Sequence, residues 1–210
     1  NSKVEKFQAP LRQLGIDLTF DYRKDQLGHR GGYEGAIFVE GWFYCPSMPQ
    51  NLIDATEDHR AGLIDDDTYR DLIARRRRYA FRVHEHADAD GYIRLVCPAG
   101  GAAPTASCGI KGSDGTTLIH VVPERPGKAC TQQTLTFPLT TYAKFGQDLQ
   151  YGSRVWHETY SRARNTIEGF NGFVKDGSYE ALGEASRRRV RGYTSQFFMC
   201  ALLVMVANLR

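Results

Sequence analysis

The sequence predicts an α/β fold that a mixed α+β insertion interrupts, and two observations lead to this expectation. Residues 4–14 carry apolar side chains at helical spacing and end at Gly15, after which residues 16–22 alternate as a strand does. A helix, a glycine and a strand in this order form half of an α/β unit. Residues 45–150 then become turn-rich, which is typical of an irregular insertion.

The segment before the insertion predicts a hairpin. Residues 28–32 form a polar, glycine-rich turn, and residues 36–44 are typical of two short strands hinged at Gly41. We therefore divide the chain into three parts. Residues 1–44 hold a helix and strands of the core, residues 45–150 form a cysteine-containing insertion, and residues 151–210 form a C-terminal helical part of the core.

Within the insertion, the pattern predicts two helices and three strands. A short helix is expected at 48–54 and a longer one, entered through an aspartate cap, at 66–79. The strand-like segments lie at 92–96, 117–122 and 134–137. Four consecutive arginines at 75–78 suit either a phosphate-binding edge or a solvated helix end, and the sequence leaves both open.

The charge of the chain is concentrated at its C-terminal end. The formal net charge is +3, and the last 60 residues hold nine basic and five acidic side chains, so this part alone carries +4. An excess of this size suits contacts with phosphates, although a solvated helix face explains it equally well.

The composition, 41% apolar and 24% charged, excludes a disordered tail, a collagen-like fibre and a disulfide mini-protein. No signal peptide is recognisable, which favours a cytoplasmic protein. The apolar run at 197–207 is shorter than the roughly 18 to 20 residues that a bilayer requires, so we expect a buried core helix and no membrane partner.

Four of the five cysteines lie in the insertion, at Cys45, Cys97, Cys108 and Cys130. Four thiolates are a ligand set for structural Zn²⁺, and small irregular regions often need such a cross-link. None of these cysteines forms a closely spaced pair, and the possible substitute ligands are His84, His86 and His120. Buried, inert cysteines are the alternative.

Within the stretch 154–175, a long helix is expected at 156–175. Residues in a helix are spaced by 100°, so Tyr160, Arg164 and Glu168 lie one after another on the same face. The same face also carries Trp156 and Lys175. The spacing alone also fits a surface salt bridge between Arg164 and Glu168, worth a few tenths of a kcal/mol. The aromatic side chains suit a core more often than a stack on a nucleic-acid base.

Arg164, Glu168 and Lys175, separated by three and six residues, resemble the arginine, glutamate and lysine of the tyrosine-arginine-glutamate-lysine signature of bacterial insertion-sequence DDE transposases. Residues 151–210 are similar to the C-terminal region of that family throughout, including the basic run at 187–192. The family leaves two residues between tyrosine and arginine, whereas three separate Tyr160 from Arg164, so that Arg162 could share the role of the arginine.

The resemblance implies part of a ribonuclease-H-like fold, in which Glu168 is the third catalytic carboxylate. The other two carboxylates are expected upstream of Asn1, because Asp17 and Asp21 lie where the family places no catalytic aspartate. The isolated chain is therefore expected to bind DNA without cleaving it.

The implied activity is metal-dependent DNA cleavage and strand transfer, with Mg²⁺ or Mn²⁺ in a two-metal site to which Glu168 contributes. The implied partners are transposon ends and target DNA, bound by a homodimer in the cytoplasm at the nucleoid. The implied DNA contacts are Tyr160, Arg162, Arg164, Lys175, Arg187, Arg188, Arg189 and Arg191. A non-catalytic DNA-binding protein derived from a transposase, or another nuclease of this fold, remains an alternative.

Overall fold

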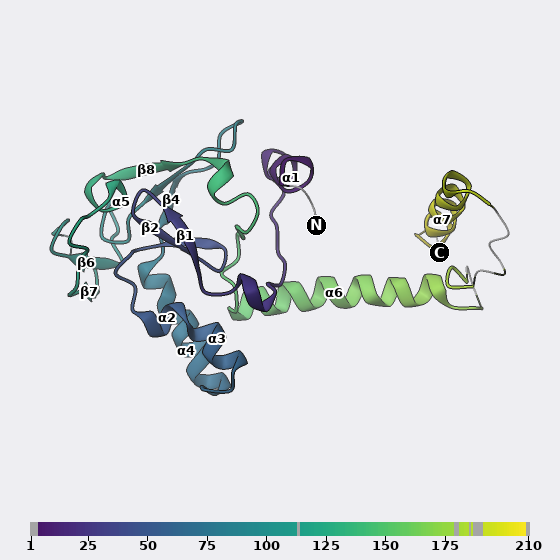
Figure 1. Ribbon diagram of the computed structural model, residues 1–210, viewed down its shortest axis with the longest axis horizontal. Coiled ribbons are helices and arrows are strands. Elements are labelled where there is room, and N and C mark those ends of the chain that lie inside the picture. The colour runs from purple at the N-terminus through teal and green to yellow at the C-terminus, as the bar shows by residue number, and fades with distance from the viewer. Residues whose placement is uncertain (1–3, 113, 179–180, 185, 187–190, 209–210) are drawn as a thin grey trace. The chain divides into compact units, whose positions relative to one another are not determined.

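The computed structural model describes residues 4–112, 114–178, 181–184, 186 and 191–208 (Figure 1). The chain separates into an N-terminal unit, Asn1–His157, and a C-terminal unit, Glu158–Arg210. Helices and strands both contribute, at 42% and 16% of the chain, which confirms a mixed fold class.

The strands of the N-terminal unit form three small sheets. Two are three-stranded and antiparallel, in the orders β1-β2-β3 and β4-β5-β8, and the third is a parallel pair, β6-β7. The strand bounds are β1 (His29–Tyr33), β2 (Ala36–Val39), β3 (Trp42–Tyr44), β4 (Arg82–Glu85), β5 (Ile93–Val96), β6 (Ala106–Cys108), β7 (Thr117–Ile119) and β8 (Thr134–Phe137).

Short helices connect these strands. The α-helices of this unit are α1 (Gln8–Gln13), α2 (Gln50–Ile53), α3 (Ala55–Arg60), α4 (Asp66–Arg76) and α5 (Lys128–Thr131). Single 3₁₀ turns lie at Val4–Lys6, Lys24–Gln26, Arg77–Tyr79 and Leu139–Thr141. The α4 helix begins at the cap Asp65, whose carboxylate accepts the backbone N–H of Thr68 at 2.8 Å.

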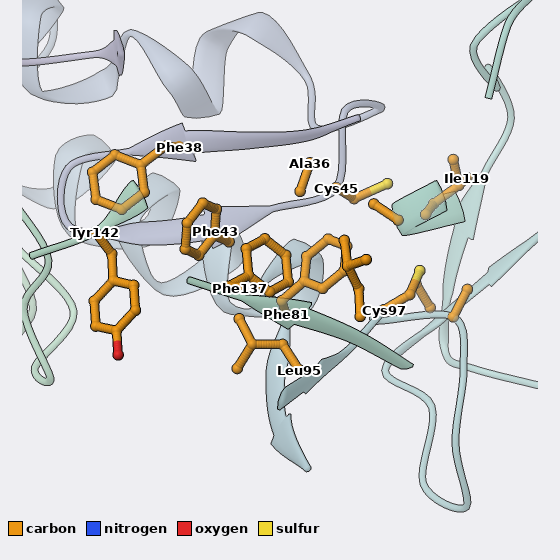
Figure 2. Packing of buried hydrophobic residues seen from close by; sticks show 14 residues of the cluster. Ala36, Phe38, Phe43, Cys45, Phe81, Leu95, Cys97, Ile119, Phe137 and Tyr142 are labelled. Carbon is orange, nitrogen blue, oxygen red and sulfur yellow. The ribbon is translucent and has the colours of Figure 1, made fainter. Parts of the chain in front are cut away.

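Strand β2 is buried on both faces, because its side chains alternate between two hydrophobic clusters. Ala36 and Phe38 pack into a cluster shared with the β4-β5-β8 sheet, where the rings of Phe43 and Phe137 are tilted by 40° with centroids 4.2 Å apart (Figure 2). Val39 faces the opposite way, into a cluster formed with α2 and α4. Residues 1–44 and 45–150 thus share one core.

Most elements expected in residues 36–137 are confirmed. Strands β2 and β3 form a hairpin whose turn is Glu40-Gly41, both with positive φ, so the hinge at Gly41 is confirmed. The three strands expected in the insertion occur as β5, β7 and β8.

The strand expected at residues 16–22 does not form. The backbone N–H of Leu18 is hydrogen-bonded to the Asp148 carboxylate at 3.3 Å, and that of Phe20 to the Gln147 amide oxygen at 3.1 Å. Alternation of apolar residues predicted a strand, but the N–H groups are satisfied by side chains instead of a neighbouring strand. The preceding helix is also shorter than expected, since α1 covers only Gln8–Gln13.

The C-terminal unit contains most of α6 (Arg154–Lys175) and all of α7 (Tyr193–Asn208). The helix expected at 156–175 is confirmed, and it begins two residues earlier, at Arg154. The expectation of a buried core helix at 197–207 is wrong for the structure: the helix forms, but Phe197 and Phe198 are 63% and 65% exposed. No described helix combines the length and the hydropathy that crossing a bilayer takes.

Candidate functional site

A row of three side chains runs along α6, four residues apart. The Nε of Arg164 donates a hydrogen bond to Glu168 Oε1 at 2.8 Å. This bond and the charge of Glu168 raise the pKa of Arg164 above its ordinary value, and the adjacent Tyr160 adds to the shift. The face predicted from helical spacing therefore brings Tyr160, Arg164 and Glu168 together, and all three are at least partly accessible to solvent.

The other residues expected to contact DNA lie at different positions of the C-terminal unit. Arg162 and Lys175 are exposed on α6, and Arg191 is exposed just before α7. Arg187, Arg188 and Arg189 lie outside the described residues. Only Lys175 shares the face of Arg164, because Arg162 lies about 200° around the helix from Arg164. These accessible cations can contact phosphates without rearrangement of a core.

Glu168 has only a limited capacity to hold a metal ion. Its carboxylate is engaged by Arg164, and in the described part of the chain no three histidine, cysteine or acidic side chains stand in a metal-holding arrangement. A two-metal site requires several oxygen ligands. The described residues therefore do not form the expected Mg²⁺ or Mn²⁺ site by themselves.

Trp156, on the same helix, is a packing residue. Its side chain is buried, its indole N–H donates to the Gln147 amide oxygen at 2.9 Å, and its ring contacts Tyr151 with centroids 4.6 Å apart. These contacts anchor the first turn of α6 in the N-terminal unit. Stacking of Trp156 on a displaced base is therefore not available in this structure.

Asp17 and Asp21 lie in the segment that lacks regular secondary structure. The Asp21 carboxylate accepts a hydrogen bond from the Tyr151 hydroxyl and lies 3.1 Å from a guanidinium nitrogen of Arg60. Burial and the hydrogen bond to Asp21 raise the pKa of Tyr151. Asp21 thus has a structural role in fixing Tyr151 and Arg60.

The arginine run at 75–78 divides between burial and solvent. Arg76 is fully buried, Arg75 lies 3.5 Å from Asp71, and Arg77 and Arg78 are exposed. Because consecutive residues point around a helix, the run provides no single basic face.

A cavity of about 590 Å³ in the N-terminal unit had no signal in the sequence. His59 stacks on Tyr69 at 4.4 Å in its wall and is hydrogen-bonded to Asp66 at 2.7 Å. Its lining comes from α3, α4 and the start of α6, with Thr56, His59, Arg60, Asp66, Tyr69, Arg70, Tyr151, Gly152, Arg154 and His157. Tertiary contacts between separate helices create this cavity, so no local sequence pattern predicts it.

The four cysteines of the insertion converge. Cys45, Cys97, Cys108 and Cys130 all line one small cavity of about 10 Å³. Burial raises the pKa of the Cys45 thiol to about 12 and also raises the pKa values of Cys97 and Cys130. The expected substitute ligands are exposed and do not line this cavity; they are His84, His86 and His120.

Comparisons of the chain with protein-family models, curated proteins and solved structures give no significant match. The function is therefore argued from the residues of this chain. The row of side chains on α6 is the feature on which the function is argued.

Proposed function

We propose that this chain is part of a DDE-type transposase, in which Glu168 is the third catalytic carboxylate of a metal-dependent site for DNA cleavage and strand transfer. The proposal includes Mg²⁺ or Mn²⁺ as cofactor and two aspartates supplied by another segment. It also includes transposon-end and target DNA as substrates, a homodimer assembled on that DNA, and a cytoplasmic location at the nucleoid.

The observation that carries the proposal is the row of Tyr160, Arg164 and Glu168 on an accessible helix. The Glu168 carboxylate is paired with the Arg164 guanidinium. DNA phosphates therefore repel it less than they would repel an unpaired carboxylate. The same guanidinium presents further N–H donors, which suit phosphate oxygens. The pair can therefore approach a DNA backbone.

The first experiment measures binding of the 210-residue chain to a fluorescent DNA duplex by anisotropy at several salt concentrations. We expect the affinity to fall as salt rises, since phosphate contacts release counterions. Arg164→Gln and Lys175→Gln should each weaken binding uniformly across sequences and reduce the salt slope by about one. Arg70→Gln is the matched control, because Arg70 is paired with Asp67 at 2.7 Å much as Arg164 is paired with Glu168, but lies on α4 in the N-terminal unit. Equal slopes for all four proteins would contradict the proposed DNA surface.

The second experiment tests catalysis in the protein joined to the segment that supplies the two aspartates. Glu168→Gln should abolish strand transfer and leave DNA binding nearly intact, whereas Glu158→Gln on the same helix should retain transfer. Retained transfer in Glu168→Gln would refute the role of Glu168. Mg²⁺-dependent cutting by the 210-residue chain alone would show that the missing carboxylates had been assigned to the wrong place.

One observation favours a second candidate, a non-catalytic DNA-binding protein derived from a transposase. Glu168 is already neutralised by Arg164, and no second carboxylate completes a metal site among the described residues. Such a protein would bind DNA with the same salt dependence but would show no Mg²⁺-dependent cleavage or transfer in any longer form. The two experiments together separate these functions.

A further inference from the structure

We propose that Cys45, Cys97, Cys108 and Cys130 form a structural Zn²⁺ site that cross-links the irregular part of the N-terminal unit to its two antiparallel sheets. This inference does not depend on the proposed function, because the four cysteines belong to the N-terminal unit and the α6 row belongs to the C-terminal unit, and because zinc would serve folding here. Zinc in such a site would be tetrahedral with four thiolate ligands and no open position for a substrate.

The convergence of the four side chains is the first argument. They come from four separate segments: Cys45 follows β3, Cys97 follows β5, Cys108 ends β6 and Cys130 lies in α5. All four nonetheless line one cavity, while the fifth cysteine, Cys200, lies on α7 in the other unit. Figure 2 shows Cys45 and Cys97 on the same side of the core, beside Ile119.

The local backbone around three of these cysteines is the second argument. The carbonyl of each of these cysteines accepts a hydrogen bond from the backbone N–H three residues later, so each cysteine begins a tight turn at a strand end. The N···O distances are 3.0 Å from Met48 to Cys45, 2.9 Å from Gly100 to Cys97 and 3.2 Å from Lys111 to Cys108. Zinc ligands commonly lie on such turns, or knuckles.

Charge balance supports the same ligand set. Binding of Zn²⁺ displaces the four thiol protons and leaves a centre with a net charge of −2. Two cations lie at the turns that follow these cysteines: the backbone N–H of Lys111 donates to the Cys108 carbonyl, and Arg82 binds the backbone of Gly100, three residues after Cys97. Both cations are held in place, because Lys111 donates to the Gln132 carbonyl, and Arg82 to the carbonyls of Gly100 and Ala103.

The size of the cavity indicates how the site would close. A volume of about 10 Å³ is on the order of one water-sized sphere. No three of these groups are already placed as metal ligands in the described residues, so binding draws the sulfur atoms inward. The turns after β3, β5 and β6 can move in this way more readily than the strands themselves.

The need for a cross-link follows from the small elements nearby. Strands β6 and β7 have three residues each and pair only with one another, and α5 has four residues. Isolated pairs of this length are marginal in water, and metal ligation commonly supplies the missing stability.

The test uses the 210-residue chain purified in reducing buffer without chelator. We expect about one zinc per chain by elemental analysis, and X-ray absorption showing about four sulfur neighbours at roughly 2.3 Å. Cys45→Ser, Cys97→Ser, Cys108→Ser and Cys130→Ser should each lose most of the bound zinc. Cys200→Ser, the matched control, should keep one zinc per chain.

Thiol alkylation of the unmodified chain covers the case in which the serine variants fail to fold. Four thiols should be protected in the zinc-loaded chain and should react after a chelator is added, while Cys200 reacts in both states. A folded chain that takes up no zinc, or zinc that persists in any of the four insertion variants, would overturn the site. Disulfide formation among these cysteines in the freshly purified chain would overturn it as well.

Discussion

The guanidinium of Arg76 and the carboxylate of Glu40 form an ion pair in which both side chains are 1% exposed. The pair is fully hydrogen-bonded: Glu40 also accepts the backbone N–H of Gly28 at 3.1 Å and the hydroxyl of Thr56 at 2.8 Å. Arg76 donates in addition to the carbonyls that end α2, including Ile53 at 3.0 Å. It thereby joins the hairpin turn to α2 and α4.

Removal of one partner leaves the other charge buried without compensation. We expect Glu40→Gln and Arg76→Met each to lower the free energy of unfolding by about 3 to 5 kcal/mol, measured by urea denaturation. The control is Arg75→Met, which removes an exposed pair with Asp71 and should cost at most about 1 kcal/mol. If Glu40→Gln and Arg75→Met had equal effects, the buried pair would not be essential to the fold.

Gly41 permits a close approach that no other residue would allow. It has a φ of +100°, and a Cβ built on it would lie 2.7 Å from the Tyr22 hydroxyl oxygen. Gly41→Ala should therefore destabilise the protein by more than the roughly 1 to 2 kcal/mol that a left-handed conformation costs.

The variant Gly62→Ala separates the cost of the left-handed backbone from the cost of the close contact with Tyr22. Gly62 has a φ of +72°, but nothing lies within 4 Å of the position that an added Cβ would take, so only the backbone cost applies. Thermal unfolding of both variants should show the larger loss for Gly41→Ala. Equal losses would indicate that the contact with Tyr22 relaxes without cost.

The sequence predicted the elements whose patterns are local. The hairpin at residues 36–44 follows from alternation, the start of α4 from its aspartate cap, and α6 from Trp156 onward from helical spacing. The segment 16–22 shows where this reasoning fails, because its alternation suits a strand but its N–H groups bind side chains of Gln147 and Asp148. Contacts over such sequence separations leave no local pattern.

The candidate sites divide in the same way. The Arg164–Glu168 pair could be predicted, since residues four apart on a helix are neighbours. The convergence of the cysteines could only be suggested, because their spacing contains no close pair and their meeting depends on four separate segments. The burial of Arg76 within a run of arginines depends on Glu40, which lies 36 residues earlier.

Trp156 fixes the start of α6 to the N-terminal unit. Trp156→Ala should cost about 3 to 5 kcal/mol, because it removes a buried ring that packs on Tyr151. Trp156→Phe keeps much of the ring but loses the hydrogen bond to Gln147, so a cost of about 1 to 3 kcal/mol is expected.

The control for Trp156 is Val155→Ala, since Val155 is 53% exposed and should change stability by no more than about 0.5 kcal/mol. Binding of DNA by Trp156→Phe should equal that of the unchanged chain. A selective loss of DNA binding without loss of stability would instead assign this tryptophan to the nucleic-acid surface.

Alkaline pH should destabilise the fold through Tyr44. Burial raises the pKa of Tyr44 from its usual 10 to about 12. Between these values the unfolded chain has released the proton and the folded chain has not, so stability is full below about pH 10 and is lost as pH rises towards 12. The free energy of unfolding should therefore be lower at pH 11 than at pH 8. Because the buried Tyr22 and Tyr151 contribute in the same direction, Tyr44→Phe should reduce the loss by about 1 to 2 kcal/mol without abolishing it. An undiminished loss in Tyr44→Phe would show that this hydroxyl ionises alike in the folded and unfolded chains.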